Sequence, residues 1–406
     1  MVVEYADSDT ATELAEKARN FMDEEVIPTE REYLGDGPVP ESVIADLRDE
    51  ARERGIYCPQ IGEEYGGGGY DFRDVLPLFE QAGRSLLGHP AMRVDAPDEG
   101  NMHTLEMFGT EAQKEEYLKP LVAGELQSGF SMTEPMQGAG SDPKMMQTRA
   151  EKDGDEWVID GHKWWTTNGA TADILLVMAR TDMDAHPYAG TSIILVPSDA
   201  DGVEVVEATP HLGQELVPEN HAEIRYDEVR VPAENLLGEE GEGFAMAQKR
   251  LGPARLTHCM RYSGMAQRSL GIAKAYMEER GAFDQQLADK QDLRHRIAER
   301  ETQLHAARSM VRDAARKIAR GEEARIEVAM SKYYTANVVQ ETVDLALQCC
   351  GGSGISRHLP IADFYESLRA FRIIDGADEV HKRSIAREAF ADENVPAGEL
   401  ENLPRF

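Results

Sequence analysis

Apolar side chains recur every three or four residues in the first part of the chain, which is the period of an amphipathic helix. The clearest example covers residues 11–26. We expect this helix to end at Pro28, because proline lacks the N–H that a helix interior needs. Another helix is expected over residues 103–119, leading to Pro120. We therefore predict a helical domain over residues 1–126.

Short β-rich runs separated by turn residues follow over residues 127–238. Residues 156–159 and 162–166 flank Asp160-Gly161, a dipeptide that suits the type I′ turn of a hairpin. Four further runs continue the pattern: 174–179, 192–196, 202–206 and 222–226. Regular spacing of short strands predicts a compact β-barrel or sandwich domain.

The helical period returns over residues 239–391, and the long helices favour a bundle. The expected helices cover residues 243–280, 288–320, 322–350 and 360–370, with one more after Asp378. A polar tail is expected over residues 392–406. The predicted fold class is therefore a multi-domain α+β protein, in the order helical, β, helical.

Composition narrows the class of function. The formal net charge of -32 argues against a nucleic-acid partner, because phosphate binding needs clustered lysine and arginine. The same charge is typical of an acidic enzyme, and it also suits a salt-adapted, halophilic surface. No apolar run approaches the ~20 residues that span a bilayer, and the N-terminus lacks the pattern of a signal peptide. We expect a cytoplasmic protein whose four cysteines are reduced.

Two motifs in the β region combine hydroxyl groups, glycines and aromatic rings. Residues 128–142 carry Thr133 and Ser141 beside glycines that would let backbone amides approach a ligand. Residues 161–169 place two tryptophans beside two threonines, a combination that suits a flat ring system. The alternatives are an ordinary glycine loop and a strand with core tryptophans.

Two further motifs lie in the second helical region. Arg280 and Phe283 would share a face if their segment is helical, and could then hold an anionic group and a ring. The alternative is a solvated helix face. Residues 348–356 contain three glycines at the end of an expected helix, where glycine is common for structural reasons alone.

Asp375 lies in an expected loop between two helical segments and precedes a glycine. It is either a functional carboxylate or a turn residue. The nearby Asp378, Glu379 and His381 are better explained as the start of a helix, where acidic residues favour the helix dipole, than as metal ligands. We therefore predict no metal site.

Taken together and in this order, the motifs resemble the acyl-CoA dehydrogenase family over roughly residues 10–390. Residues 250–267 and 375–381 are similar to the branch whose animal members are fused to a kinase-like domain. The resemblance implies an N-terminal helical domain, a central β domain and a C-terminal four-helix bundle. It implies FAD as cofactor, an acyl-CoA substrate in fatty acid β-oxidation, electron-transfer flavoprotein as acceptor, and a homodimer or homotetramer.

The family pattern also assigns roles to matching positions. The residues implied to line the flavin and the thioester are Phe130, Met132, Thr133 and Ser141. Those implied to flank the flavin ring are Trp165, Thr166 and Thr167. Those implied to hold the pyrophosphate and adenosine of FAD, bound largely to a neighbouring subunit, are Arg280, Phe283, Gln291, Gln348, Gly351 and Gly352. The family pattern also implies flavin contacts for two residues shortly after Asp375, namely Ala377 and Glu379. Substrate contacts are implied for Ser141, Arg255 and Gly376.

Asp375 is the expected catalytic base for removal of the Cα proton. The family usually places a glutamate before the glycine here, and aspartate offers the same chemistry with a shorter reach. Some members carry the base on the preceding helix, but the matching residue is Ala254, which cannot serve. We expect the bound acyl chain and flavin to raise the pKa of Asp375 by desolvation.

Other outcomes of the same fold stay open at this point. One is an acyl-CoA oxidase or a flavin monooxygenase, although a carboxylate at position 375 favours proton abstraction. Another is a non-catalytic acidic binding protein, which the retained Asp375, Arg280 and Trp165 disfavour.

Overall fold

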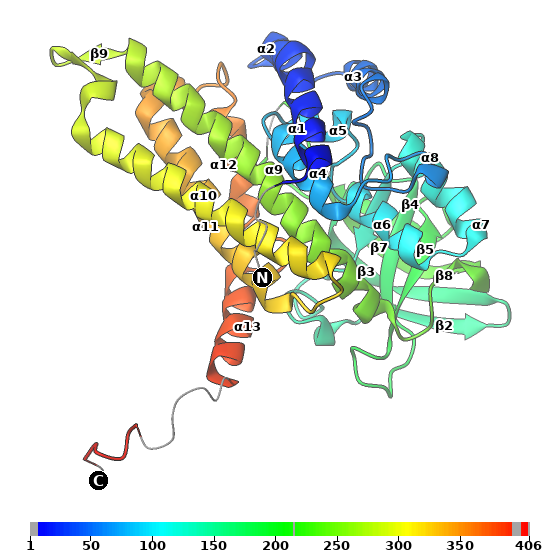
Figure 1. The fold of residues 1–406 in the computed structure, drawn as a ribbon. Helices are drawn as coiled ribbons and strands as arrows, with labels where there is room; N and C mark the ends of the chain where they lie inside the picture. The colour runs from blue at the N-terminus through cyan, green and yellow to red at the C-terminus, as the bar shows by residue number, and fades with distance from the viewer. Residues whose placement is uncertain (1–6, 214–215, 392–398, 405–406) are drawn as a thin grey trace.

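Helices, strands and helices follow one another along the chain, as the sequence predicts (Figure 1). This computed structural model describes residues 7–213, 216–391 and 399–404. The predicted tail over 392–406 therefore lies mostly outside the described residues. Within the described ranges, no helix is both long enough and apolar enough to cross a membrane.

The first region is a cluster of short helices. Its core is built from apolar residues at helical spacing, such as Leu14, Ala18 and Phe21, which are buried. The α-helices are α1 (Asp9–Phe21), α2 (Ile27–Tyr33), α3 (Glu41–Glu53), α4 (Phe72–Ala82), α5 (Gly88–Ala91), α6 (Asp98–Phe108), α7 (Glu111–Gln113) and α8 (Lys119–Ala123).

The expected helix end at Pro28 is wrong. A π-helical turn over Met22–Val26 joins α1 to α2, and Pro28 lies in the first turn of α2. The residue before the proline bonds five residues back, to the Met22 carbonyl, so the wider turn accommodates a proline, which has no N–H to donate. The same arrangement recurs at Pro120, where a π-helical turn over Lys114–Leu118 leads into α8.

The β region is one eight-stranded sheet. The strands are β1 (Ser128–Ser131), β2 (Arg149–Asp153), β3 (Glu156–Thr167), β4 (Ile174–Arg180), β5 (Thr191–Pro197), β6 (Val203–Ala208), β7 (His221–Pro232) and β8 (Leu236–Leu237). Their order is β6-β7-β3-β2-β4-β5-β8, with β1 parallel to β4. Both faces of β4 are buried, which explains its apolar run over residues 174–179.

The predicted hairpin turn at Asp160-Gly161 is wrong. Strand β3 runs straight through this dipeptide, with a register shift against β7 between Ile159 and Gly161. A side chain at Gly161 would collide with Thr148, so the glycine marks a close packing contact. The turn lies instead between β2 and β3, where Gly154 has a φ of 66°.

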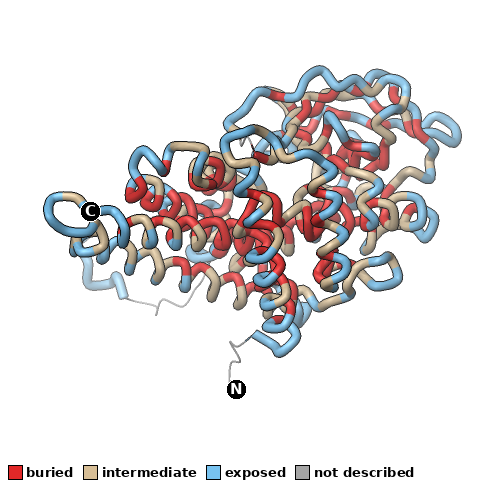
Figure 2. The backbone as a smooth tube through the Cα atoms, turned by 90° about the horizontal axis from the view of Figure 1, so that it is seen from above, coloured by how far each residue is buried: buried red, intermediate tan, exposed pale blue. Residues whose placement is uncertain are grey.

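The last region is a bundle of long helices. They are α9 (Gly243–Glu279), α10 (Gln291–Ala319), α11 (Arg325–Cys350), α12 (Ile361–Ala370) and α13 (Asp378–Ala391), and they match the predicted helices closely. Buried positions run along the inside of the bundle and on into the other two regions (Figure 2). The four cysteines are buried and free, as predicted.

An ion pair fixes the first helical region to the bundle. Arg268 of α9 donates to both carboxylate oxygens of Glu30, at 2.9 and 2.5 Å, and Glu30 is fully buried. Ser85 Oγ donates a further hydrogen bond to the same carboxylate. A buried carboxylate with this many donors has its desolvation offset, which makes the contact a rigid junction.

Candidate active site

Asp375 lies in the short loop between α12 and α13, as predicted. Its φ is 54°, and Gly376 follows with a φ of 95°. The left-handed region is costly for a residue with a Cβ, so surrounding contacts have to hold this loop in place.

Three side chains from different helices hold the loop through its carbonyl groups. Arg255 Nε of α9 donates to the Asp375 carbonyl at 2.8 Å. Lys332 Nζ of α11 donates to the carbonyls of Phe371 and Gly376, at 2.6 and 2.8 Å. His381 Nε2 of α13 lies 3.2 Å from the Asp375 carbonyl. The strained backbone is thereby fixed from three sides.

The Asp375 carboxylate faces His258 of α9. Oδ2 lies 2.9 Å from His258 Nδ1, and the side chains are only 18% and 9% exposed. The imidazole packs against Tyr262 and Phe371, with ring centroids 5.9 and 6.0 Å away. The carboxylate is therefore mostly buried, with the His258 ring as its nearest charged or polar side chain in the described part of the chain.

Burial raises the pKa of Asp375, but His258, Arg255 and Arg250 together outweigh it and hold that pKa well below its usual range. The carboxylate is accordingly ionised, as a base requires. The rise that we expect on binding of acyl chain and flavin concerns the complex, and it stays a prediction. Burial also lowers the pKa of His381 to about 4, helped by Arg255 and Lys332, so this imidazole is neutral at pH 7.

The two motifs of the β region meet at the end of β1. Trp164 N–H donates to the Thr133 carbonyl at 2.8 Å. Lys163 Nζ, fully buried, donates to the Met132 carbonyl at 2.9 Å and to Glu134 at 3.1 Å. Burial lowers the pKa of Lys163 to about 8 although Glu134 opposes the shift. These bonds fix the loop that carries Thr133.

Arg250 connects this loop region to the bundle. Its guanidinium lies 4.3 Å from the centre of the Phe130 ring, and its Nε donates to Asn101 Oδ1 at 3.1 Å. Burial lowers the pKa of Arg250, while the charges of Asp375 and Glu99 oppose the shift. Arg250 therefore interacts both with the Phe130 ring and with the charge of Asp375.

The aromatic segment at the end of β3 has an accessible ring. Trp165 is 41% exposed and has a φ of 60°, whereas Thr166 beside it is buried against Ser131. Thr167 Oγ1 lies 3.0 Å from His221 Nδ1. An accessible indole beside a fixed hydroxyl fits the flat, polar-edged ring of a flavin.

The remaining predicted cofactor residues lie apart from Asp375. Arg280, Phe283 and Gln291 are exposed around the β9–β10 hairpin (Gly281–Ala282 and Gln285–Gln286), at the far end of the bundle from the β region (Figure 1). The expected shared helical face of Arg280 and Phe283 is wrong, because α9 ends at Glu279 and Phe283 lies in the hairpin turn with a φ of 58°.

Exposed predicted residues also occur elsewhere. Gln348 is near the end of α11, and a Cβ at Gly351 or Gly352 would meet nothing within 4 Å, so both glycines border open space. Ser141 and Glu379 are exposed, and Ala377 is half-buried before α13. One chain therefore brings Asp375, Gly376 and Arg255 into direct contact, and leaves the pyrophosphate and adenosine residues separate from them.

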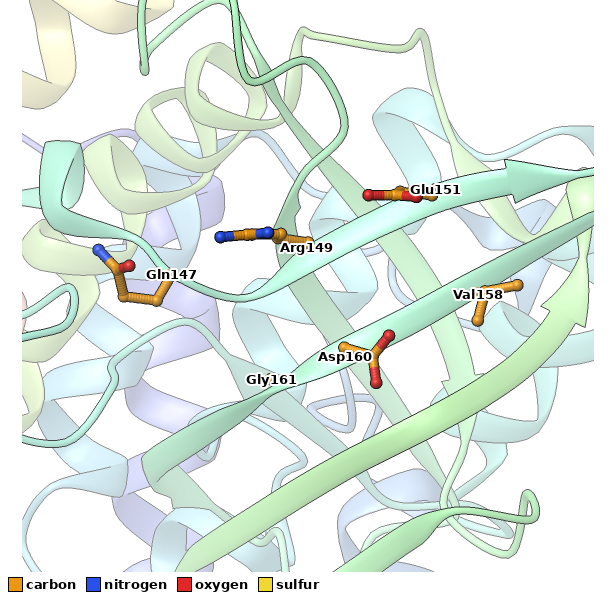
Figure 3. Close-up of a pocket in the computed structure, with 6 residues that line it drawn as sticks. All are labelled: Gln147, Arg149, Glu151, Val158, Asp160 and Gly161. Atoms are coloured by element: carbon orange, nitrogen blue, oxygen red, sulfur yellow. The ribbon is translucent and has the colours of Figure 1, made fainter.

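A polar groove of about 390 Å³ crosses β2 and β3 (Figure 3). Its lining residues are Gln147, Arg149, Glu151, Val158, Asp160 and Gly161. The lining includes none of the predicted site residues, and it carries one arginine and two acidic residues. The groove therefore plays no part in the site around Asp375.

Four residues of the site were missed from the sequence: Arg250, His258, Lys332 and His381 in contact with or close to the Asp375 loop. One signal was available. His258 follows Arg255 by three residues in a predicted helix, so the two side chains had to share a face.

The whole of this architecture matches known proteins. The acyl-CoA dehydrogenase N-terminal domain matches residues 8–125, the middle domain matches 129–229 and the C-terminal domain matches 241–390. The chain therefore belongs to the acyl-CoA dehydrogenase family, a class of oxidoreductases whose cofactor is FAD. The predicted fold class and cofactor are thereby confirmed.

Individual relatives refine the placement. A FadE2 protein of Mycobacterium tuberculosis, named as a probable acyl-CoA dehydrogenase, is 40% identical over 403 residues, covering 96% of this chain and 98% of the relative. Human acyl-CoA dehydrogenase family member 11 is 33% identical over 93% of this chain, which spans half of that protein. It belongs to the branch that the motifs indicated.

Solved structures agree with these sequence matches. Butyryl-CoA dehydrogenase from Megasphaera elsdenii is 29% identical, with a TM-score of 0.83 over 95% of this chain and 99% of that one. An acyl-CoA dehydrogenase from Geobacillus kaustophilus is 30% identical, with a TM-score of 0.82 over 94% of this chain and 98% of that one.

Proposed function

We propose that this chain catalyses the α,β-dehydrogenation of an acyl-CoA thioester to the trans-2-enoyl-CoA, with Asp375 removing the Cα proton. The observation that supports this proposal best is the buried, ionised Asp375 carboxylate on a strained loop. Groups kept in costly conformations commonly belong to functional sites, and a carboxylate is a suitable base for a proton next to a thioester carbonyl.

The side chains around the Asp375 loop hold the base in position. Arg255, Lys332 and His381 fix the carbonyl groups of residues 371–376, so that the base cannot drift away from the Cα proton. The same bonds fix the backbone of Asp375 and Gly376. We propose that amide groups of this loop donate to the thioester oxygen as negative charge develops on it.

The residues that we propose to hold FAD from one chain are those that match the flavin-contacting positions of the family. They are Phe130, Met132, Thr133, Ser141, Trp165, Thr166, Thr167, Ala377 and Glu379. FAD supplies the acceptor for the Cβ hydride, while the protein supplies orientation and electrostatics.

We further propose that a second copy of the chain completes the cofactor site. The implied pyrophosphate and adenosine residues Arg280, Phe283 and Gln291 lie around the β9–β10 hairpin, at the far end of the bundle from β3, the strand that contains Trp165 (Figure 1). A single flavin can use both sets only if they come from different subunits. This proposal requires a homodimer or a homotetramer.

The test is an anaerobic titration of the purified protein with acyl-CoAs of different chain length, followed by flavin absorbance in high salt. Wild type should bleach with at least one member of the panel. Asp375→Ala should bind FAD normally and show no bleaching, whereas Asp155→Ala, in the exposed β2–β3 turn, should behave as wild type.

Bound flavin that no acyl-CoA reduces would contradict the proposed reaction. Rapid oxygen consumption after bleaching would indicate an oxidase, whereas reoxidation by electron-transfer flavoprotein would support the acceptor that we propose. The chain length that bleaches fastest would define the substrate class.

A further inference from the structure

His258 is a buried polar side chain whose position the proposed reaction does not yet explain. Its Nδ1 atom and Asp375 Oδ2 are both shielded from solvent, and among the described residues neither atom makes a hydrogen bond of regular geometry. They approach each other to 2.9 Å. Two otherwise unpartnered buried polar atoms that face each other are better explained as a functional pair than as packing.

We infer that His258 is the positioning residue of the base: its ring holds Oδ2 of Asp375 and leaves Oδ1 for the Cα proton. This inference rests on the proposed function. His258 Nδ1 lies 2.9 Å from Oδ2, and no hydrogen bond to Oδ1 is present among the described residues. The carboxylate can then rotate little, and its free oxygen keeps one direction.

The charge of His258 would control the rate. A protonated imidazole 2.9 Å from Oδ2 stabilises the carboxylate and opposes its uptake of a proton. A neutral imidazole orients the carboxylate without this penalty. Reduction should therefore be slower wherever His258 carries a charge, which a pH profile of the reduction rate tests.

Other ionisable groups surround the pair and contribute to the same field. They come from α5, α9, α11 and α13: His89, Arg250, Arg255, Cys259, Arg261, Tyr262, Lys332 and His381. The arginines keep their charge at all relevant pH values, so they do not create a pH dependence. The contact distance singles out His258, because among the described residues no other Lys, Arg or His side chain lies within 4 Å of this carboxylate.

The test compares wild type with His258→Val and His258→Asn. Asparagine places an amide N–H near the Nδ1 position but cannot become charged, whereas valine keeps volume and removes the donor. The readout is the rate of anaerobic flavin reduction by the best acyl-CoA, measured across about pH 5 to 8, where histidines ordinarily titrate. His305→Asn, at an exposed site on α10, is the matched control.

We expect His258→Val to reduce the rate at high pH by about 100-fold, the loss typical of a misplaced reacting group. His258→Asn should recover much of that rate and lose the acidic fall seen in wild type and in His305→Asn. A wild-type pH profile retained in His258→Asn, or a wild-type rate in His258→Val, would overturn the role of His258 alone. A wild-type flavin that no acyl-CoA reduces at any pH would overturn the proposed function as well.

Discussion

Replacing Lys332 by methionine should separate stability from activity. The substitution keeps an unbranched side chain of similar length in a fully buried site and removes the ammonium group. Both hydrogen bonds to the loop carbonyls of Phe371 and Gly376 are then lost. The loop that carries Asp375 loses its anchor to α11.

Two opposing contributions set the change in stability. Each hydrogen bond from a charged donor is worth roughly 1.5–3 kcal/mol, so the two contribute about 3–6 kcal/mol. Burial, opposed by Asp375, Cys259 and Asp378, lowers the pKa of Lys332 from 10.5 to about 8. This shift corresponds to a cost of about 3 kcal/mol for keeping the side chain charged at pH 7. The net loss of stability is therefore about 0–3 kcal/mol.

The rate of flavin reduction should fall much further, by about 100-fold, because the base is no longer held against the substrate. Urea unfolding measures the first quantity and anaerobic stopped-flow absorbance the second. Lys274→Met, which removes a half-exposed ammonium paired with Glu301 on the outside of the bundle, should change neither appreciably. A wild-type reduction rate in Lys332→Met would refute the idea that the lysine holds the base loop.

Three further changes test other parts of the structure. Glu30→Ala leaves Arg268 partly buried and unpaired, so urea unfolding should show a loss of about 3–5 kcal/mol, and a loss below 1 kcal/mol would contradict the rigid junction. His381 titrates at about 4 when folded against 6.5 when unfolded, so its contribution is complete above pH 6.5 and is lost as the pH falls toward 4, by up to about 3 kcal/mol. Melting curves at pH 7 and pH 5 should show this acid sensitivity reduced in His381→Gln, and parallel curves would argue against it. Gly376→Ala should lower the free energy of unfolding by about 1–3 kcal/mol and slow flavin reduction, because φ is 95° and the new Cβ would lie 3.0 Å from His381 Nε2. Gly271→Ala is the control: its Cβ would meet nothing within 4 Å, so it should change neither quantity.

The sequence predicted elements where pattern alone decides the structure. The long helices of the bundle follow from helical periodicity, and β4 follows from its apolar run. It failed where distant packing decides. Nothing local distinguishes Asp160-Gly161 from Asp153-Gly154 as the hairpin turn, and the contact between Gly161 and Thr148 became visible only in three dimensions.

The active-site residues show the same contrast between what local pattern predicts and what distant packing decides. Asp375 and Arg255 could be predicted because they occur in motifs with family-wide patterns, and the structure brings them into contact. Lys332 could not, since a lysine in the middle of an apolar helix face has no local feature that indicates carbonyl partners some 40 residues later. His258 required knowledge of the loop that faces it.

The π-helical turn over Met22–Val26 sets the rotational phase of everything after it. An extra residue within a helical turn rotates the following side chains by roughly 100° about the helix axis. The direction in which the Glu30 side chain leaves the helix depends on that rotation, and so does its ion pair with Arg268. Deleting one residue from this turn would leave the helix propensity of the segment nearly unchanged, yet it would point Glu30 toward a different neighbour. The π-helical turn therefore fixes which side chains face the bundle, and the number of residues in this segment is as constrained as their identity.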